Sequence, residues 1–383
     1  MTDPLSLTKK RPQTPMLIGY DGRFITKKTT GNGIYATRLI EALSLVDDHN
    51  YYRVYMADQD ARATLELSKN VEIRAMHPLH RSAWLRVPFL FPWELHRRPV
   101  DIFHAHYTVP TWIRTKVVLT LHDFFWVIHP EHFISWKRIP LTWIVKRSVA
   151  HADRILVGTS FMQRETVEYF KVPEGRVKVI PYGIDVRFFS TTSEEQRAQL
   201  RKKYAIEGPY ILAVGDIHPR KNLGRLLEAF IALPRHHDTK LVLVGKPIWK
   251  VGDLFGRIKR AGLEDRVVAT GYVPDEDMPG LYQGAEVFCY PSLYEGFGFP
   301  ILEAMASGVP VAASETTSCP EVGGPAALYF DPLRVESIAE SISRILTSPE
   351  LRSKQIEVGS VWVRRFSWEE TARRTAEVYW ELA

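Results

Sequence analysis

The stretch YEGFGFPILEAM, residues 294–305, sets two glutamates, Glu295 and Glu303, around a glycine-rich turn and a proline. Pro300 suits the first turn of a helix, where a missing N–H costs nothing. We therefore predict that Glu295 lies in a loop and Glu303 in the first helical turn. A carboxylate there is well placed to accept hydrogen bonds from a ribose diol.

The start of this predicted helix has the chemistry of an anion site. It offers the backbone N–H groups of Ile301 and Leu302 at the positive end of the helix dipole. Gly296 and Gly298, on either side of Phe297, let the backbone approach a ligand closely. The segment thus combines a seat for a phosphate with two carboxylates, although an ordinary helix start with solvated acids would look similar.

The same run resembles the Glu-x7-Glu signature of retaining glycosyltransferases of family 4, and its residue sequence is similar to that of the mannosyltransferase branch. The resemblance extends over nearly the whole chain. It implies an α/β protein of the GT-B fold, with two Rossmann-like, doubly wound domains facing across a cleft and a C-terminal helix crossing back to the N-terminal domain. It also implies a nucleotide-sugar-dependent hexosyltransferase that has no cofactor and needs no metal.

The composition is that of a soluble globular protein, with 45% hydrophobic and 25% charged residues. Two cysteines, Cys289 and Cys319, cannot form a disulfide framework and favour a reducing compartment. The N-terminus lacks the apolar core of a signal peptide, and no apolar run is long enough to span a bilayer. We therefore expect a cytoplasmic protein, peripheral on the inner face of the membrane if it associates with one.

Short apolar, β-branched runs alternate with helical patterns, which predicts parallel sheets. The expected strands are 16–20, 52–57, 71–75, 101–105, 116–121, 154–158, 177–180, 210–214, 241–245, 267–270, 286–290, 310–313 and 328–330. The expected helices are 33–46, 60–68, 84–96, 141–152, 160–170, 222–233, 253–262, 278–284, 300–307 and 335–347, with further helix over 350–383.

The polar segment 186–207 predicts a domain junction. We place a disordered lead-in at residues 1–14, an acceptor-binding domain at 15–190 completed by the C-terminal helix at about 366–383, and a domain that binds the nucleotide-sugar at 191–365.

Two adjacent cations follow the strand expected at 210–214. Gly215 ends the strand, and Arg220 and Lys221 precede a helix for which Asn222 is a good N-cap residue. Ligands bind at the carboxyl ends of parallel strands, so these cations suit a diphosphate. A solvated basic turn is the alternative.

The resemblance assigns roles to these positions. Lys221 matches the lysine of the family, whereas Asp216 stands where many members have an arginine, so Arg220 would supply that guanidinium. The loop containing Val273 would hold the nucleotide base through backbone groups. Glu295 would bond the hydroxyls of the transferred sugar.

In the first half, Gly31, Asn32, Gly33 and Ala36 fit Gly-x-Gly-x-x-Ala, a dinucleotide fingerprint, and Asp58 follows the next strand. A turn of that kind should directly follow its strand, and here about ten residues intervene. The resemblance instead makes Gly31, Asn32 and Gly33 a glycine loop that closes on the donor diphosphate. An NAD site and a plain helix cap are the alternatives.

Histidines end two of the expected strands. His122 and Asp123 follow strand 116–121, where the resemblance places a histidine beside the transferred sugar. His104 and His106 share one face of strand 101–105, and with Asp123 they are candidates to bind the acceptor. The alternative is a hydrolytic metal site with His122 or Asp123 as third ligand.

The first 185 residues carry 26 Lys+Arg against 18 Asp+Glu, whereas the remainder carries 24 against 26. Basic residues alternate with aromatic ones over 74–147, which suits an anionic membrane surface better than nucleic acid because no nucleic-acid module accompanies them. The alternative is that these are solvated surface charges over a buried aromatic core, with no role in binding. The basic residues expected on this surface include Arg81, Arg86, Arg97 and Arg98.

Taken together, these observations predict mannose transfer from GDP-mannose to a glycan or a polyprenyl-diphosphate-linked saccharide in polysaccharide biosynthesis. The alternatives are a UDP-glucose-dependent glucosyltransferase of the same fold, a GT-B sugar-nucleotide epimerase and a catalytically silent sugar-binding protein.

Overall fold

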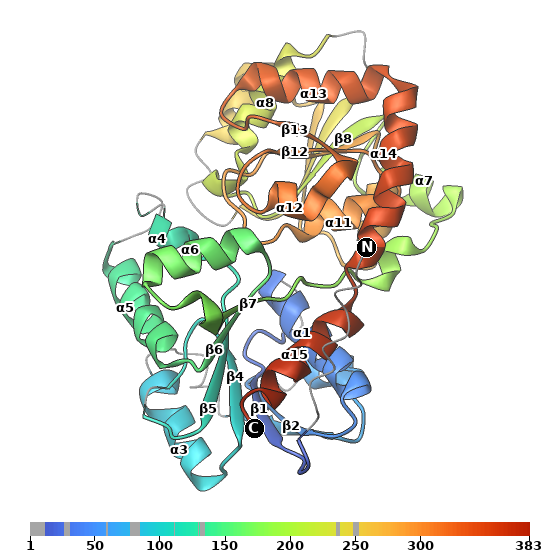
Figure 1. Cartoon of the computed structure of the whole chain (residues 1–383). Helices are drawn as coiled ribbons and strands as arrows, with labels where there is room; N and C mark the ends of the chain where they lie inside the picture. The colour runs from blue at the N-terminus through green and yellow to red at the C-terminus, as the bar shows by residue number, and fades with distance from the viewer. Residues whose placement is uncertain are drawn as a thin grey trace, which may run out of the picture. The chain divides into compact units, whose positions relative to one another are not determined.

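The computed structural model describes residues 12–26, 31–58, 60–76, 85–110, 112–128, 130, 135–234, 238–247 and 253–383. Most of the expected lead-in, residues 1–11, lies outside this description. The chain divides into two compact units: unit 1 is Met1–Gly183 with Phe366–Ala383, and unit 2 is Ile184–Arg365. Each unit has one parallel sheet with helices packed on it (Figure 1).

The sheet of unit 1 has seven strands in the order β3-β2-β1-β4-β5-β6-β7. The strands are β1 (Leu17–Asp21), β2 (Tyr51–Met56), β3 (Val71–Ala75), β4 (Ile102–His106), β5 (Lys116–Thr120), β6 (Arg154–Val157) and β7 (Val177–Val179). The helices are α1 (Gly31–Val46), α3 (Phe91–Arg97), α4 (Phe125–Ile128), α5 (Ser135–His151), α6 (Ser160–Phe170) and α15 (Trp368–Trp380). Short helical turns are η1 (Asp60–Thr64), η3 (Arg86–Leu90) and η5 (Glu174–Arg176).

The sheet of unit 2 has six strands in the order β10-β9-β8-β11-β12-β13. They are β8 (Tyr210–Val214), β9 (Lys240–Val244), β10 (Val267–Gly271), β11 (Val287–Tyr290), β12 (Val311–Ser314) and β13 (Ala327–Phe330). The helices are α7 (Glu194–Lys203), α8 (Leu223–Ala232), α9 (Leu254–Arg260), α10 (Met278–Gln283), α11 (Phe299–Ala306), α12 (Cys319–Gly323), α13 (Val335–Thr347) and α14 (Pro349–Trp362). Short turns are η6 (Val186–Phe189), η7 (Pro219–Lys221), η8 (Gly324–Ala326) and η9 (Val363–Arg365).

Each sheet has one topological switch point. In unit 1, β1 and β4 are neighbours in the sheet. The chain continues from β1 to β2 on one side of this pair and from β4 to β5 on the other. In unit 2 the same relation holds between β8 and β11. Ligands of open parallel sheets bind beyond the carboxyl ends of the strands at such points, so the fold predicts one candidate ligand site in each unit.

The C-terminal helix α15 packs against α1 within unit 1. The hydroxyl of Tyr379 lies 2.6 Å from Nδ1 of His104, and the ring of Trp368 meets that of Tyr35. Gly183 is needed at this contact, because a Cβ there would lie 2.2 Å from the backbone nitrogen of Trp368. Trp368 and Tyr379 of α15 therefore serve the packing of unit 1.

The expected strands are confirmed to within a residue or two, but three helices differ from the prediction. The helix expected over 141–152 begins six residues earlier, at Ser135, and is α5. The helix predicted over 60–68 is wrong: only η1 forms, because the N–H groups of Glu66 and Ser68 donate to Glu41 and Ser44 of α1 instead. The single helix predicted over 84–96 is a π-helical turn, η3, followed by α3. Pro88 and Pro92 lie within this second segment, where their missing N–H groups interrupt the regular ladder.

No helix in the described part of the chain is both long and apolar enough to cross a membrane. Cys289 and Cys319 are both free and buried.

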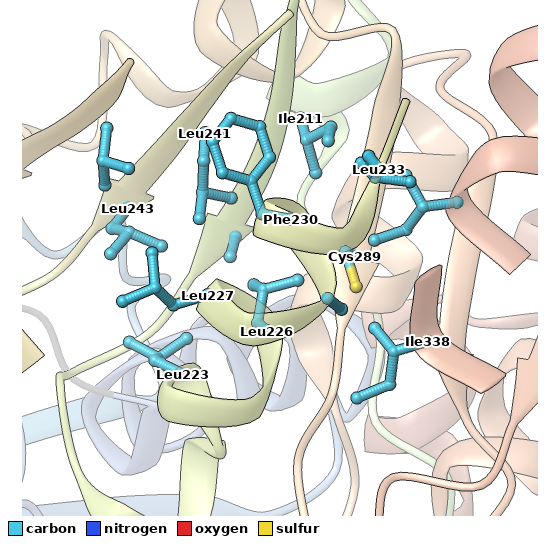
Figure 2. Packing of buried hydrophobic residues seen from close by; sticks show 14 of the residues in the cluster. Ile211, Leu223, Leu226, Leu227, Phe230, Leu233, Leu241, Leu243, Cys289 and Ile338 are labelled. Carbon is cyan, nitrogen blue, oxygen red and sulfur yellow. The ribbon is translucent and has the colours of Figure 1, made fainter. Parts of the chain in front are cut away.

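The core of unit 2 is organised by α8, whose apolar residues recur at helical spacing. Figure 2 shows Leu226, Leu227 and Phe230 packed among strand residues, with Cys289 of β11 and Ile338 of α13 in the same cluster. Residues at i, i+1 and i+4 place this stripe on one face of the helix.

We predict that Leu226→Ala destabilises unit 2 by about 2–5 kcal/mol, because the side chain is 0% exposed and its removal leaves a cavity. Ile231→Ala, on the same helix but 50% exposed, is the matched control and should cost far less. Urea unfolding followed by fluorescence measures both. Equal losses would show that α8 does not pack as described.

Candidate functional site

The switch point of unit 2 gathers the predicted diphosphate-binding cations and the loop glutamate. The turn η7 after β8 carries Arg220 and Lys221, and the loop after β11 carries Glu295. Nη1 of Arg220 lies 2.6 Å from Oε2 of Glu295, and Nζ of Lys221 lies 2.7 Å from Oε1. The three predicted residues thus form one ion-pair cluster.

Gly215 makes room for this cluster. Its φ of +136° lies in a region that side chains rarely adopt, and a Cβ there would lie 2.9 Å from Cε of Lys221. Asp216, which replaces the family arginine, is exposed, whereas Arg220 contacts Glu295 directly. The structure therefore places the guanidinium of Arg220, and no charge of Asp216, in this cluster.

The electrostatics of the cluster keep its carboxylate ionised. Burial by itself would raise the pKa of Glu295, but the adjacent Arg220 and Lys221 cations outweigh it and hold the pKa at about 2. Burial lowers the pKa of Lys221, and the charge of Glu295 opposes that shift. Two cations and one carboxylate leave a net positive charge, which suits an anionic diphosphate.

Three further residues hold this cluster that the sequence did not single out. The hydroxyl of Tyr290 accepts from Lys221 at 2.7 Å. The hydroxyl of Ser318 donates to the carbonyls of Glu295 and Phe297, and that of Thr317 accepts from the N–H of Glu295. Thr317 and Ser318 come from beyond β12, so no local pattern could have identified them.

The helix α11 begins as predicted but differs in detail. Pro300 is the second residue of the helix, and Gly298, with a φ of +110°, is its N-cap. The prediction that Glu303 lies in the first turn is wrong, because α11 begins at Phe299 and its first turn contains no acidic residue. The N–H of Ile301 is not free either, since it donates to the carbonyl of Gly298 at 3.1 Å.

The buried carboxylate of Glu303 has its own environment. The hydroxyl of Tyr282 in α10 donates to Oε2 at 2.7 Å. Burial raises the pKa of Glu303 to about 7; the hydrogen bond from Tyr282 works against this shift, and the charge of Asp275 adds to it. Glu303 therefore titrates near neutral pH, unlike Glu295.

The remaining unit 2 predictions concern backbone contacts. Gly296, Phe297 and Leu302 are buried, and the first two directly follow Glu295 in the chain. The side chain of Val273 is also buried, which leaves its backbone as the group that could meet a base. Asn222 is the N-cap residue of α8, as predicted, but its backbone is left-handed and its side chain makes no capping hydrogen bond, because it donates to the carbonyl of Pro332 instead.

In unit 1 the predicted glycine loop lies at the start of α1. Gly31 is exposed, Gly33 is buried, and Nδ2 of Asn32 donates to the hydroxyl of Tyr107 at 3.4 Å. β1 ends at Asp21, well before Gly31. The separation does not match the tight strand-to-helix turn of a dinucleotide fingerprint.

The predicted histidines form a buried cluster at the ends of β4 and β5. Nδ1 of His106 lies 3.2 Å from Nε2 of His122, whose Nδ1 lies 3.1 Å from the hydroxyl of Tyr182. Burial lowers the pKa values of His104 and His122 to about 3. At such pKa values these imidazoles are neutral at physiological pH, and each offers one N–H donor and one acceptor nitrogen.

This arrangement restricts the expected roles. His104 is fully buried, and its two ring nitrogens are bonded to Tyr379 and Thr120, so its side chain faces the core of unit 1 rather than an acceptor or a metal. Asp123 is half-buried and accepts from the N–H of Phe125. Within the described residues, no group of three or more His, Cys, Asp or Glu side chains is arranged to hold a metal.

The basic aromatic residues of unit 1 are partly exposed. We define the α3–α5 surface as eight exposed residues: Phe89, Trp93, Arg97, Arg98, Ile139, Trp143, Lys146 and Arg147. The guanidiniums of Arg97 and Arg147 lie over the rings of Trp93 and Trp143. Arg86 does not belong to it, because its side chain is buried, and Arg81 lies outside the described residues.

Comparison with known families matches both halves of the chain. The family described as "Glycosyltransferase Family 4" matches residues 30–188, and that described as "Glycosyl transferases group 1" matches residues 196–362.

Similar proteins include the O-antigen chain mannosyltransferase B of Escherichia coli, which is 29% identical over 91% of this chain and 96% of its own. The MMP α-(1→4)-mannosyltransferase of Mycolicibacterium hassiacum is 32% identical over 64% of this chain and 59% of its own. The structure of a sucrose-phosphate synthase from Thermosynechococcus elongatus superposes with a TM-score of 0.77 at 22% identity, covering 96% of this chain and 99% of that one. At that identity the structural match bears on the fold alone.

We predict that Glu303→Ala and Glu295→Ala affect binding and turnover differently. If Glu303 bonds the ribose, as the sequence predicts, Glu303→Ala should weaken GDP binding about ten- to a hundredfold, as expected for loss of a charged hydrogen bond. Glu295→Ala should leave GDP affinity equal or higher, because Arg220 and Lys221 lose a competing carboxylate, yet should lower kcat. Calorimetry and steady-state kinetics measure the two quantities. Equal loss of GDP affinity would mean that the glutamates are wrongly assigned.

The pKa of Glu303 predicts a pH dependence. The carboxylate is present above about pH 7 and is lost as the pH falls through that value, so GDP affinity should fall about tenfold between pH 8 and pH 6 if the ribose requires the ionised form. Glu303→Gln is the control, since it carries no titrating group while the phosphates of GDP titrate equally with both proteins. A ratio of the two affinities that does not change with pH would contradict the prediction.

Proposed function

Since this chain belongs to the retaining glycosyltransferases of family 4 and has their GT-B fold, we propose that it transfers mannose from GDP-mannose to a saccharide acceptor in glycan biosynthesis. The observation that carries the proposal is the cluster of Arg220, Lys221 and Glu295 at the switch point of unit 2. It places the cations that would stabilise a leaving diphosphate next to the carboxylate that we propose contacts the sugar.

The chemistry follows from the position of the charges. When the sugar leaves its nucleoside diphosphate, negative charge develops on the diphosphate oxygens, and preorganised cations stabilise it. Arg220 and Lys221 are held in place before the reaction by Glu295 and Tyr290, so little reorganisation is needed. Glu295 orients the transferred sugar for attack by the acceptor. Because the cations belong to the protein, we propose that transfer requires no metal.

The mannosyl donor is supported by the mannosyltransferases to which this chain is similar. A lipid-linked saccharide, or another glycan chain, is the proposed acceptor, in keeping with the name of the O-antigen chain relative. A UDP-glucose-dependent enzyme is the second candidate, because the buried side chain of Val273 leaves the base to be recognised by backbone groups.

We predict that GDP binds at least about tenfold more tightly than UDP or ADP, and that GDP-mannose supports transfer in the presence of EDTA. Calorimetry with the three diphosphates and a radiolabelled transfer assay test both parts. Tighter binding of UDP would favour the glucosyltransferase, and isomerised donor without transfer would favour an epimerase. A loss of activity in EDTA that Mg²⁺ or Mn²⁺ restores would contradict the metal-free mechanism.

We also propose that the α3–α5 surface meets an anionic membrane. The crossovers from β3 to β4 and from β5 to β6 run in the same direction across the sheet, so right-handed connections place α3 and α5 on one face. Trp93 and Trp143 are both 58% exposed and lie beside basic groups. Aromatic rings with flanking cations suit the interface of an anionic bilayer.

Replacing Arg97, Arg98, Lys146 and Arg147 with Ser should abolish flotation with anionic liposomes at low salt, because each cation contributes about 1 kcal/mol near such a surface. The control removes four exposed cations of unit 2, Lys202, Lys259, Lys354 and Arg364, and should still float. GDP affinity should be the same in both variants. The proposal fails if wild-type protein ignores anionic liposomes, or if both variants lose flotation equally.

A further inference from the structure

Two buried arginines lie at the switch point of unit 1, and none of the roles assigned above uses them. Arg23 follows β1, and Arg86 opens η3. Nη1 of Arg23 and Nη2 of Arg86 both donate to Oγ1 of Thr108, at 2.8 and 3.3 Å. Two guanidiniums therefore converge on one hydroxyl oxygen.

The burial of these charges is costly without a counter-charge. Arg86 is 3% exposed, and the side chain of Arg23 is 13% exposed. One fully buried carboxylate, that of Asp21, acts on both and lies 3.6 Å from Nε of Arg23. Burial, and after it the charge of Arg86, lowers the pKa of Arg23 to about 10. These three groups together carry one net positive charge.

A neutral donor lies next to this pair. Arg23 also donates to the carbonyl of His106, whose Nε2 is buried and has no hydrogen-bond partner among the described residues. If Tyr182 donates to Nδ1 of His122, then Nε2–H of His122 donates to Nδ1 of His106. Nε2 of His106 then carries the proton and is an unused donor.

These residues lie at the kind of position in the fold where open parallel sheets bind ligands. Arg23 and Thr108 each follow a strand by two residues, β1 and β4, at the point where the strand order reverses. In unit 2 the corresponding point, after β8 and β11, carries Arg220, Lys221 and Glu295. Both switch points thus combine two cations with one carboxylate, so in each the charges of these three groups sum to one positive charge.

We propose that Arg23 and Arg86, with Thr108 and His106, bind a phosphate group of a second ligand. Planar guanidiniums suit phosphate oxygens because each can donate two parallel hydrogen bonds, and the hydroxyl and imidazole add neutral donors. That this ligand is the acceptor, which would then be a phosphorylated saccharide or a lipid-linked saccharide phosphate, rests on the proposed function. The phosphate site itself does not.

Binding is measured by calorimetry on the full chain with the nucleotide site saturated by GDP. The probes are inorganic phosphate, a hexose phosphate, a short-chain prenyl diphosphate and an uncharged methyl hexoside. We expect at least one phosphate compound to bind and the uncharged hexoside to bind far more weakly. A preference for the hexose phosphate would identify a phosphorylated sugar as the source, and a preference for the prenyl compound a lipid carrier.

Arg23→Gln and Arg86→Gln should each weaken phosphate binding about tenfold or more, as expected for a charged hydrogen bond. Arg53→Gln is the control, since Arg53 in β2 pairs with Glu72, and should leave it unchanged. Thermal unfolding separates binding from structure: phosphate should raise the Tm of the wild type but not of the two variants.

The proposal is overturned if no phosphate compound binds to the wild type, or if the two variants unfold at lower temperature while keeping wild-type phosphate affinity. The second result would make the arginines structural. Because none of these measurements uses turnover, phosphate binding in a protein without transferase activity would refute the proposed function and leave the site standing.

Discussion

The carboxylate of Glu295 between Arg220 and Lys221 is the interaction on which the site of unit 2 depends. It joins the turn after β8 to the loop after β11, two neighbouring strands whose connections run in opposite directions. Because the carboxylate is buried with two cations, it remains ionised well below neutral pH. The cations are thereby fixed in position without being fully neutralised, which is the condition for stabilising a leaving diphosphate.

The two glutamates of one short segment have opposite electrostatic settings. Glu295 lies against cations and its pKa is low, whereas Glu303 lies against Tyr282 and its pKa is raised to about 7. The difference separates a permanently charged carboxylate from one that titrates under physiological conditions. Distinct settings for paired carboxylates are a common way of giving them distinct roles.

The two units use their switch points in comparable ways. Each gathers a pair of cations and one carboxylate around the switch point of its sheet. They differ in surroundings, since unit 1 adds neutral histidines and tyrosines whose pKa values are shifted by burial. Because each of the two parallel sheets reverses its strand order once, the chain offers the same kind of ligand position in each unit.

The sequence by itself determined the strand and helix order and the candidate residues of unit 2, because apolar periodicity and glycine positions are local properties. It failed where distant groups intervene, as when Glu41 and Ser44 capture the N–H groups of the segment 60–68. Only the tertiary structure decided that Arg220 and Lys221 meet Glu295, that Ser318 supports it, and that Arg23 and Arg86 share Thr108. Side-chain contacts and pKa shifts depend on which strands become neighbours and on the burial that follows, and no local pattern specifies either.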